Sequence, residues 1–211
     1  MKNFIAVAGN IGVGKSTLVR MMQARLGWQP FYEAVVDNPY LADFYADMPR
    51  YAFHSQIFFL TRRLHAHREL LDAPGVAVQD RSVYEDAEVF ARNLFRQGAM
   101  GERDYRTYEE LYHVLTEFLP PPDLIVYLRA SVETLLRRIA LRGRDYEKNI
   151  SRDYLAQLNE LYEEWVASFR HAPVLCVPAD RLDYVQYEAD MELVLNKVQD
   201  KLRGEQPVLF E

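Results

Sequence analysis

The chain has 211 residues, of which 49% are hydrophobic and 27% charged, which is enough for one sizeable core, and we expect a single domain over 1–211. A net charge of −6 argues against a general nucleic-acid-binding surface, and the single cysteine, Cys176, excludes an intramolecular disulfide and a cysteine-based zinc site. We expect no membrane association and a cytoplasmic location, because the first residues lack a signal pattern and no apolar run approaches membrane-spanning length.

Short apolar runs alternate along the chain with longer helix-like patterns. Strands are expected at residues 3–8, 30–34, 76–79, 123–128 and 173–177. Helices are expected at residues 16–26, 39–48, 50–72, 83–97, 102–119, 131–142, 151–170 and 186–203. This alternation predicts an α/β fold with a five-stranded parallel sheet flanked by helices on both faces. Ligands of such sheets bind at the carboxyl ends of the strands, so the residues after each strand are the candidate site residues.

A glycine-rich loop follows the first strand. Its sequence fits G-x-x-x-x-G-K-[ST], with a strand before it and a helix after it. Backbone N–H groups of such a loop surround phosphate oxygens, the lysine reaches the β- and γ-phosphates, and the serine hydroxyl is a Mg²⁺ ligand. The sequence therefore predicts a Mg·ATP site formed by Gly9, Asn10, Ile11, Gly12, Val13, Gly14, Lys15, Ser16 and Thr17.

Charged side chains follow the other strands. Glu33 follows the second strand, and Asp80 and Arg81 end the third. A carboxylate at position 80 can hold Mg²⁺. Arginine forks match phosphate oxygens and stabilise charge during phosphoryl transfer. Three arginines suited to this role follow the fourth strand: Arg138, Arg142 and Arg144.

Other patterns limit the class of nucleotide-binding protein. A signalling GTPase needs N-K-x-D, whereas this chain has "NKVQD" at 196–200, inside a helical pattern. It also needs D-x-x-G after a strand, whereas "DAPG" at 72–75 precedes one. A small P-loop protein with charged residues at its other strand ends indicates a kinase that acts on a small molecule.

Together these segments resemble the deoxyribonucleoside kinase family, and most of all its bacterial deoxyadenosine/deoxycytidine kinases. The resemblance runs from Phe4 to about Val177 and is carried by "GNIGVGKST", "NPYLADFY", "FHSQIFFLTRR", "QDRSVYED" with "EVFA", and "LRGRDYEK". It implies a P-loop kinase fold with an arginine-rich lid at about 138–150, ATP and Mg²⁺ as cofactors, and a homodimer. The implied reaction is transfer of the γ-phosphate to the 5′-hydroxyl of a deoxynucleoside, in nucleotide salvage.

The same resemblance implies roles for individual residues. Glu33 would be the base that deprotonates the 5′-hydroxyl, Asp80 would bind Mg²⁺, and Arg81 would lie beside the hydroxyl and the nucleobase. The lid arginines would contact the migrating phosphoryl group. Tyr45 and Glu147 would hold the 3′-hydroxyl. The nucleobase would be read by Gln56, Arg63, Asp86 and Phe90.

Spacing and chemistry agree with this pocket and predict its preference. Gln56 and Arg63 are seven residues apart on one helix, and Asp86 and Phe90 are four apart on another, so each pair shares a face. A carboxylate accepts hydrogen bonds, so Asp86 favours a base with an exocyclic amine. We expect deoxyadenosine to be the best substrate and deoxycytidine the second best. Deoxyguanosine stays open as a substrate, because an arginine can pair with the N7/O6 edge of guanine, and thymidine should be a poor one. Ser55 stands where relatives often have a bulky residue, which suggests a larger base pocket.

Alternative interpretations stay open at this stage. Phe90 and Tyr45 fit core packing, and Gln56 and Asp86 fit ordinary polar surface positions. A nucleoside monophosphate kinase would need a basic clamp beside Glu33, where "FYEAVVDNPYL" is acidic and neutral. A non-catalytic ATP-binding P-loop module would not need Glu33, the Asp-Arg pair and the lid arginines together.

Overall fold

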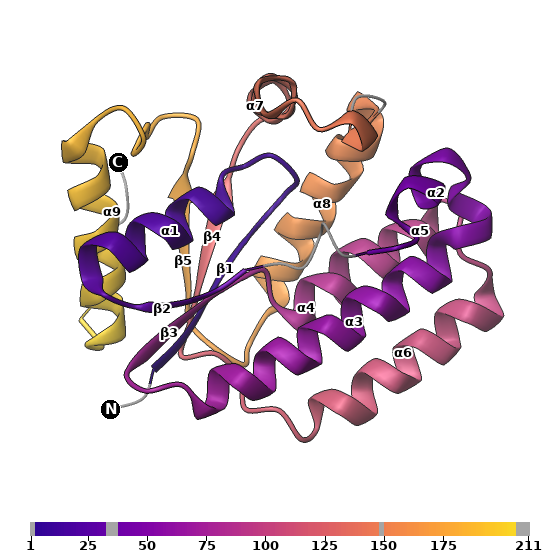
Figure 1. Cartoon of the computed structure of the whole chain (residues 1–211), viewed down its shortest axis with the longest axis horizontal. Helices are drawn as coiled ribbons and strands as arrows, with labels where there is room; N and C mark the ends of the chain where they lie inside the picture. The colour runs from indigo at the N-terminus through magenta and orange to yellow at the C-terminus, as the bar shows by residue number, and fades with distance from the viewer. Residues whose placement is uncertain (1–2, 33–37, 148–149, 206–211) are drawn as a thin grey trace.

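The computed structural model describes residues 3–32, 38–147 and 150–205. Five parallel strands form one sheet in the order β2-β3-β1-β4-β5, as Figure 1 shows. The strands are β1 Asn3–Gly9, β2 Gln29–Phe31, β3 Val76–Asp80, β4 Leu124–Arg129 and β5 Val174–Pro178. The predicted α/β class with a parallel sheet is confirmed, and the strands begin or end within two residues of the predicted positions where the chain is described.

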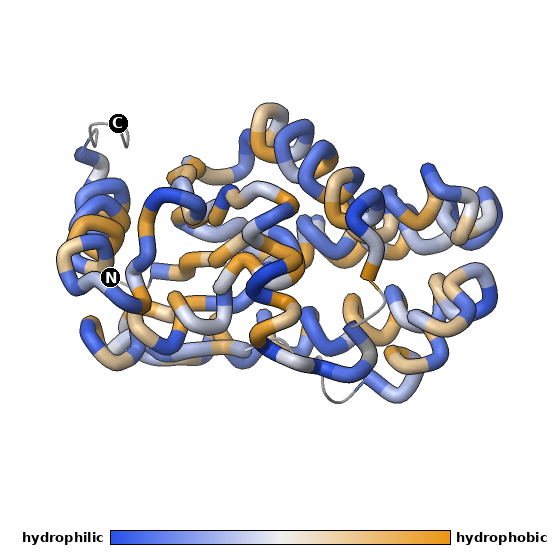
Figure 2. Tube along the Cα trace, turned by 90° about the horizontal axis from the view of Figure 1, so that it is seen from above, coloured by the Kyte–Doolittle hydropathy of each residue, from blue (hydrophilic) through white to orange (hydrophobic). Residues whose placement is uncertain are grey.

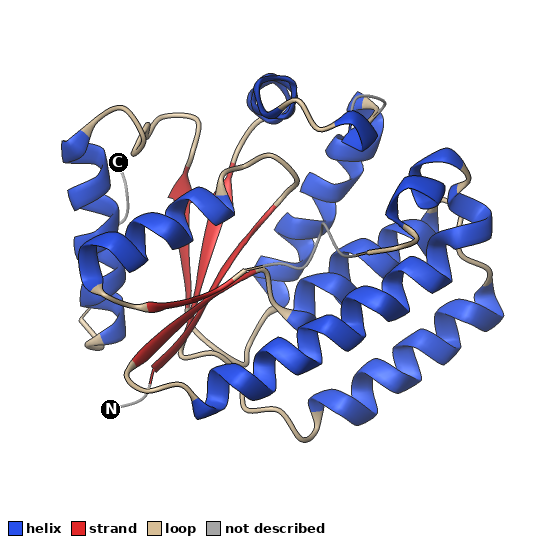
Figure 3. Ribbon diagram, viewed as in Figure 1, coloured by secondary structure: helices blue, strands red, loops and turns tan. Residues whose placement is uncertain are grey.

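Helices cover both faces of the sheet (Figure 3). They are α1 Lys15–Leu26, α2 Leu41–Ala46, α3 Met48–Asp72, α4 Val83–Glu85, α5 Arg92–Arg96, α6 Glu102–Thr116, α7 Val132–Arg142, α8 Arg152–Ser168 and α9 Glu188–Leu202. One core contains side chains of α3, α6 and α8, and the other contains side chains of α1, α7 and α9. In Figure 2 apolar and polar colours alternate along the helices, as expected for helices with one buried face.

The central strand shows why the sheet needs both layers. Ile5 and Val7 of β1 belong to the core under α1 and α9, whereas Phe4 and Ala6 belong to the core under α3 and α8. Successive side chains of a strand point to opposite faces, so a continuous apolar run is buried only when both faces are covered.

One expected helix differs from the prediction. The stretch 83–97 begins as α4 and ends as α5, but Asp86–Ala91 between them is a π-helix, labelled η1. A π-helical segment bonds i to i+5 and occurs often at functional sites. It carries both Asp86 and Phe90, so the predicted pair lies in widened rather than regular α-helical backbone.

The strand register brings the strand ends to one edge. Val7 of β1 lies opposite Asp80 of β3, and Gly9 lies opposite Leu128 of β4. The glycine loop and the Asp80–Arg81 pair therefore meet at the carboxyl edge, where ligands of parallel sheets bind. Among the described residues, no helix combines the length and the apolar character needed to cross a membrane.

Candidate active site

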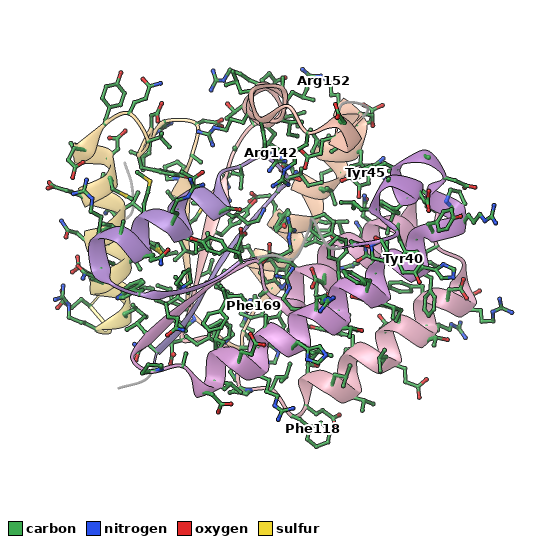
Figure 4. The ribbon with its side chains drawn as sticks, viewed as in Figure 1. Tyr40, Tyr45, Phe118, Arg142, Arg152 and Phe169 are labelled. Atoms are coloured by element: carbon green, nitrogen blue, oxygen red, sulfur yellow. The ribbon has the colours of Figure 1, made fainter. Side chains whose placement is uncertain are left out.

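A cavity of about 1040 Å³ lies at this carboxyl edge. Its walls come from the glycine loop, α2, α3, η1, α7 and the segment after β5. Figure 4 shows Arg142 beneath α7 and Tyr45 at α2, both at that end of the sheet. The predicted site residues that line the cavity are Ile11, Gly12, Gly14, Lys15, Ser16, Thr17, Tyr45, Gln56, Asp80, Arg81, Asp86, Phe90, Arg138, Arg142, Arg144 and Glu147. Gly9, Asn10, Val13 and Arg63 lie behind this wall.

The glycine loop has a backbone that other residues would not adopt. Gly14 begins α1 with φ +110°, and a Cβ there would lie 2.8 Å from the Tyr184 hydroxyl oxygen. A Cβ on Gly9 would lie 2.7 Å from the carbonyl oxygen of Leu128. The loop therefore presents bare backbone N–H groups and a helix N-terminus to the cavity, which suits an anion. The Lys15 ammonium crosses this loop and donates to the Gly9 carbonyl at 2.8 Å.

Two oxygen side chains meet beside the loop. The Ser16 hydroxyl donates to Oδ2 of Asp80. The other carboxylate oxygen, Oδ1, is buried and has no hydrogen-bond partner among the described residues. A buried carboxylate oxygen without a donor is costly unless a cation approaches it. This pair of hard oxygen ligands fits Mg²⁺.

A buried ion pair supports another wall, which Asp86 lines while Arg63 lies behind it. Arg63 donates through Nε to Asp86 Oδ2 at 3.0 Å and through Nη1 to the Asp80 carbonyl at 2.9 Å, and both side chains of the pair are 4% exposed. The arginine fixes the carboxylate and keeps its charge compensated. Gln56 also lines the cavity, is buried, and makes no side-chain hydrogen bond within the described chain. Its amide is therefore available to a ligand.

Charged side chains from the lid segment close the cavity from α7. Arg142 donates to Oε2 of Glu147 at 2.6 Å, and Arg144 lies 3.5 Å from Oε1 of the same carboxylate. Glu147 belongs to the short 3-10 turn Asp145–Glu147, which contacts α2 and so lies near Tyr45. The arginines predicted to contact the phosphoryl group therefore lie in one cluster with Glu147 and Tyr45, the residues predicted to hold the 3′-hydroxyl.

Arg138 makes a different set of contacts. Its Nη1 donates to the Val13 carbonyl at 2.6 Å and its Nη2 to the Ala179 carbonyl at 2.9 Å. The guanidinium thus joins the glycine loop to the segment after β5. Leu182–Gln186 of that segment line the cavity together with Arg138. Burial raises the pKa of Tyr184 in this segment to about 12, so its hydroxyl keeps its proton at neutral pH.

Arg81 has an unusual backbone. With φ +71° it is the one non-glycine residue of the described chain with positive φ, a conformation that costs about 1–3 kcal/mol and is found mostly at functional sites. Its guanidinium carbon lies 4.2 Å from the centre of the Phe90 ring. Its Nη1 donates to the Tyr162 hydroxyl at 2.9 Å and lies 3.8 Å from Glu85.

Several contributors were not found from the sequence. Glu85 and Tyr162 hold Arg81, and Tyr162 is 81 positions away from it along the chain. Tyr154 of α8 also lines the cavity. No local spacing signals such contacts. Ser55 does not line the cavity, and its hydroxyl accepts from the Asn38 side-chain amide at 3.1 Å, so the expected enlargement of the base pocket stays a prediction. Glu33 lies outside the described residues.

Comparison with known proteins shows that the chain matches one protein family over most of its length. A model of the family described as deoxynucleoside kinase matches residues 5–203. The chain is 38% identical to the deoxyadenosine/deoxycytidine kinase of Bacillus subtilis, over 97% of this chain and 95% of that protein. It is 38% identical to the deoxyguanosine kinase of Lactobacillus acidophilus, over 94% of this chain and 90% of that one.

A solved structure has the same fold. The deoxyadenosine kinase of M. mycoides with bound dATP superposes with a TM-score of 0.81 at 32% identity, covering 93% of this chain and 99% of that one.

Proposed function

The chain belongs to the deoxynucleoside kinase family, and on that premise we propose that it transfers the γ-phosphoryl group of ATP to the 5′-hydroxyl of deoxyadenosine in preference to other deoxynucleosides. Kinase activity toward deoxynucleosides follows from the family and from relatives that match nearly the whole chain. The nucleobase preference, the metal and the roles of single residues are the parts proposed here.

One observation supports the proposal most: a single cavity joins the anion-binding glycine loop to the buried Arg63–Asp86 pair. A triphosphate chain bound at Lys15 and a base bound at Asp86 would place the two substrates in one enclosure. Because phosphoryl transfer depends on alignment and charge stabilisation, bringing both substrates together in one cavity is the main task of the protein.

The glycine loop and lid supply the charge stabilisation. The Lys15 ammonium would exchange its contact with the Gly9 carbonyl for the β- and γ-phosphates, and Arg142 and Arg144 would exchange Glu147 for the migrating phosphoryl group. Ser16 and Asp80 would hold Mg²⁺, which when bound neutralises charge on the phosphate oxygens. These exchanges are reasonable because each cation is already anchored within reach of the cavity.

Glu33 is proposed as the base that accepts the proton of the 5′-hydroxyl. Glu33 lies outside the described residues, but in the sequence it follows Phe31, the last residue of β2, by two positions. Residues that directly follow the strands of a parallel sheet are the ones that ligands contact, which supports this role. An alcohol is a weak nucleophile, so a carboxylate that takes its proton late in the reaction assists transfer.

The base preference follows from hydrogen-bond chemistry. Asp86 is held by Arg63 in a form that only accepts, so it selects an exocyclic amine such as N6 of adenine or N4 of cytosine. The Gln56 amide can accept from the same amine and donate to the neighbouring ring nitrogen. Thymine presents a carbonyl at the matching place, which would leave Asp86 facing another acceptor, and such a mismatch is strongly discriminated.

A homodimer is also proposed. Leu111 and Val114 of α6, with Phe118 just beyond it, are 38%, 50% and 79% exposed and recur at helical spacing. An exposed apolar stripe of this kind is typical of a protein–protein interface. Light scattering of the Phe118→Ser variant, compared with the unaltered protein, tests whether this stripe joins two copies.

The function is tested by measuring product formation with Mg·ATP and a panel of acceptors. Deoxyadenosine should give the 5′-monophosphate fastest, followed by deoxycytidine or deoxyguanosine, with thymidine far behind. Phosphorylation of dAMP without phosphorylation of deoxyadenosine would favour a monophosphate kinase. Tight ATP binding with no acceptor turned over would favour a non-catalytic module.

A further inference from the structure

Glu85 is a fully buried carboxylate outside the cavity wall. Its Oε1 accepts from the Gly9 N–H at 3.1 Å and from the Tyr162 hydroxyl at 2.8 Å. Its Oε2 accepts from the N–H of Ser82 at 2.8 Å and from the hydroxyl of Ser82 at 3.2 Å. The Tyr162 hydroxyl also lies 2.9 Å from the Gly9 carbonyl oxygen, so its single proton faces both acceptors. The remaining donors meet both oxygens of Glu85, which a carboxylate can accept and an amide of the same shape cannot.

These donors belong to different parts of the site. Gly9 is the first residue of the glycine loop, and Ser82 directly follows Arg81. The Tyr162 oxygen accepts from Arg81 Nη1 at 2.9 Å, and the same guanidinium lies 3.8 Å from Glu85. Glu85 therefore connects the loop that binds the donor's phosphates with the arginine beside the acceptor pocket, through Tyr162 of α8.

The position of Arg81 depends on such support. Its left-handed backbone is intrinsically unfavourable, so contacts around it must keep it in place. Its backbone N–H donates to the Val7 carbonyl at 3.0 Å, which fixes the main chain but does not set the direction of the guanidinium. Side chains that hold the guanidinium in place include the Phe90 ring, the Tyr162 hydroxyl and Glu85.

We propose that Glu85 and Tyr162 are positioning residues that hold the Arg81 guanidinium against the acceptor pocket and tie it to the glycine loop, so that the two substrates are aligned with each other. The inference rests on the proposed function, because alignment matters only if a phosphoryl group passes between them. Neither residue lines the cavity, so both act through Arg81 and Gly9 rather than by touching substrate.

The test is a double-mutant cycle with Arg81. Glu85→Gln should lower kcat for deoxyadenosine by at least ~10-fold, and Tyr162→Phe by a smaller factor, because displacing a catalytic group by about 1 Å can cost ~100-fold. In an Arg81→Met background, Glu85→Gln should lower kcat further by less than about twofold, since residues that act as a unit are not additive. A purely structural role predicts equal losses in both backgrounds.

Two control variants carry the same kinds of substitution, glutamate to glutamine and tyrosine to phenylalanine, at residues that do not contact Arg81. Glu163 also accepts from a tyrosine hydroxyl and an arginine, Tyr127 at 3.0 Å and Arg129 at 2.8 Å, but lies outside the cavity wall. Glu163→Gln should leave kcat within about twofold of the unaltered enzyme. Tyr108→Phe removes a buried hydroxyl that has no hydrogen-bond partner among the described residues, and should do the same.

Failure of the proposed function and failure of the positioning role give different results in these experiments. No turnover of any deoxynucleoside by the unaltered protein contradicts the proposed function, and the cycle is then measured on the Kd of deoxyadenosine, where the same non-additivity is expected. Turnover with additive losses, or losses no larger than those of Glu163→Gln, overturns the positioning role. If Glu85→Gln does not fold, as judged by its thermal transition, Tyr162→Phe carries the same cycle.

Discussion

The replacement of Asp86 by asparagine is the sharpest test of how the nucleobase is read. The variant keeps the shape of the side chain and removes its charge. Arg63 then remains 4% exposed beside a neutral partner, although its hydrogen bond to the Asp80 carbonyl persists. The asparagine oxygen is expected to turn to the guanidinium, which leaves the amide NH₂ facing the base.

The magnitude follows from these contacts. A hydrogen bond to a charged group contributes about 1.5–3 kcal/mol, and here the bond lost is the one between Asp86 and the base amine. Since about 1.4 kcal/mol corresponds to a factor of ten, kcat/KM for deoxyadenosine should fall by ~10- to 100-fold. Weakening the buried ion pair costs about 3 kcal/mol of folding stability, which lowers Tm by about 6–12 °C for a domain of this size.

The assay follows ADP release with deoxyadenosine, deoxycytidine, deoxyguanosine and thymidine at saturating Mg·ATP, below the thermal transition. The value of kcat/KM should fall most for the substrates whose base carries an exocyclic amine. The preference for thymidine relative to these substrates should therefore rise. Asp104→Asn is the matched control, because Asp104 also faces an arginine but its side chain is 43% exposed. Equal losses for all four deoxynucleosides would refute base reading by this carboxylate.

Three further variants test the other assignments. Glu33→Gln should retain deoxynucleoside binding but lose at least ~100-fold in turnover, and near-full activity would refute its role as the base. Asp80→Asn should raise the Mg²⁺ concentration needed for half-maximal rate by ~10-fold or more, and an unchanged Mg²⁺ dependence would remove this residue from the metal site. Burial lowers the pKa of His67, so the unfolded chain binds more protons than the fold and stability falls as pH drops below about 6.5. In the His67→Phe variant, the free energy of unfolding measured in urea should no longer fall in this way as the pH drops. If it depends on pH as steeply as in the unaltered protein, the lowered pKa of His67 is contradicted.

The sequence predicted those features of the fold that depend on local pattern. The strands of continuous apolar residues are buried on both faces, as β1 shows with Ile5 in one core and Ala6 in the other. The glycine loop has its own signature, and the strand ends lie at one edge for reasons of topology. The family resemblance also assigned Asp86 and Arg63 to one base pocket, and the two form an ion pair although 23 residues separate them.

The features that were missed depend on contacts that no local pattern records. The π-helical backbone of 86–91 has no composition of its own, so 83–97 appeared as one helix. Glu85 contacts Gly9 across 76 residues and Tyr162 across 77, so its role becomes visible only in three dimensions. The hydrogen bond from Asn38 to Ser55, 17 residues apart, is another contact of this kind.

The most direct measurement of the central claim is a crystal structure of the protein with deoxyadenosine and a non-hydrolysable Mg·ATP analogue. The account predicts the γ-phosphate at Lys15 and the adenine between Gln56 and Asp86, with the 5′-oxygen in line with the terminal phosphorus. A deoxyadenosine bound away from Asp86, or with its 5′-oxygen pointing away from Lys15, would contradict it.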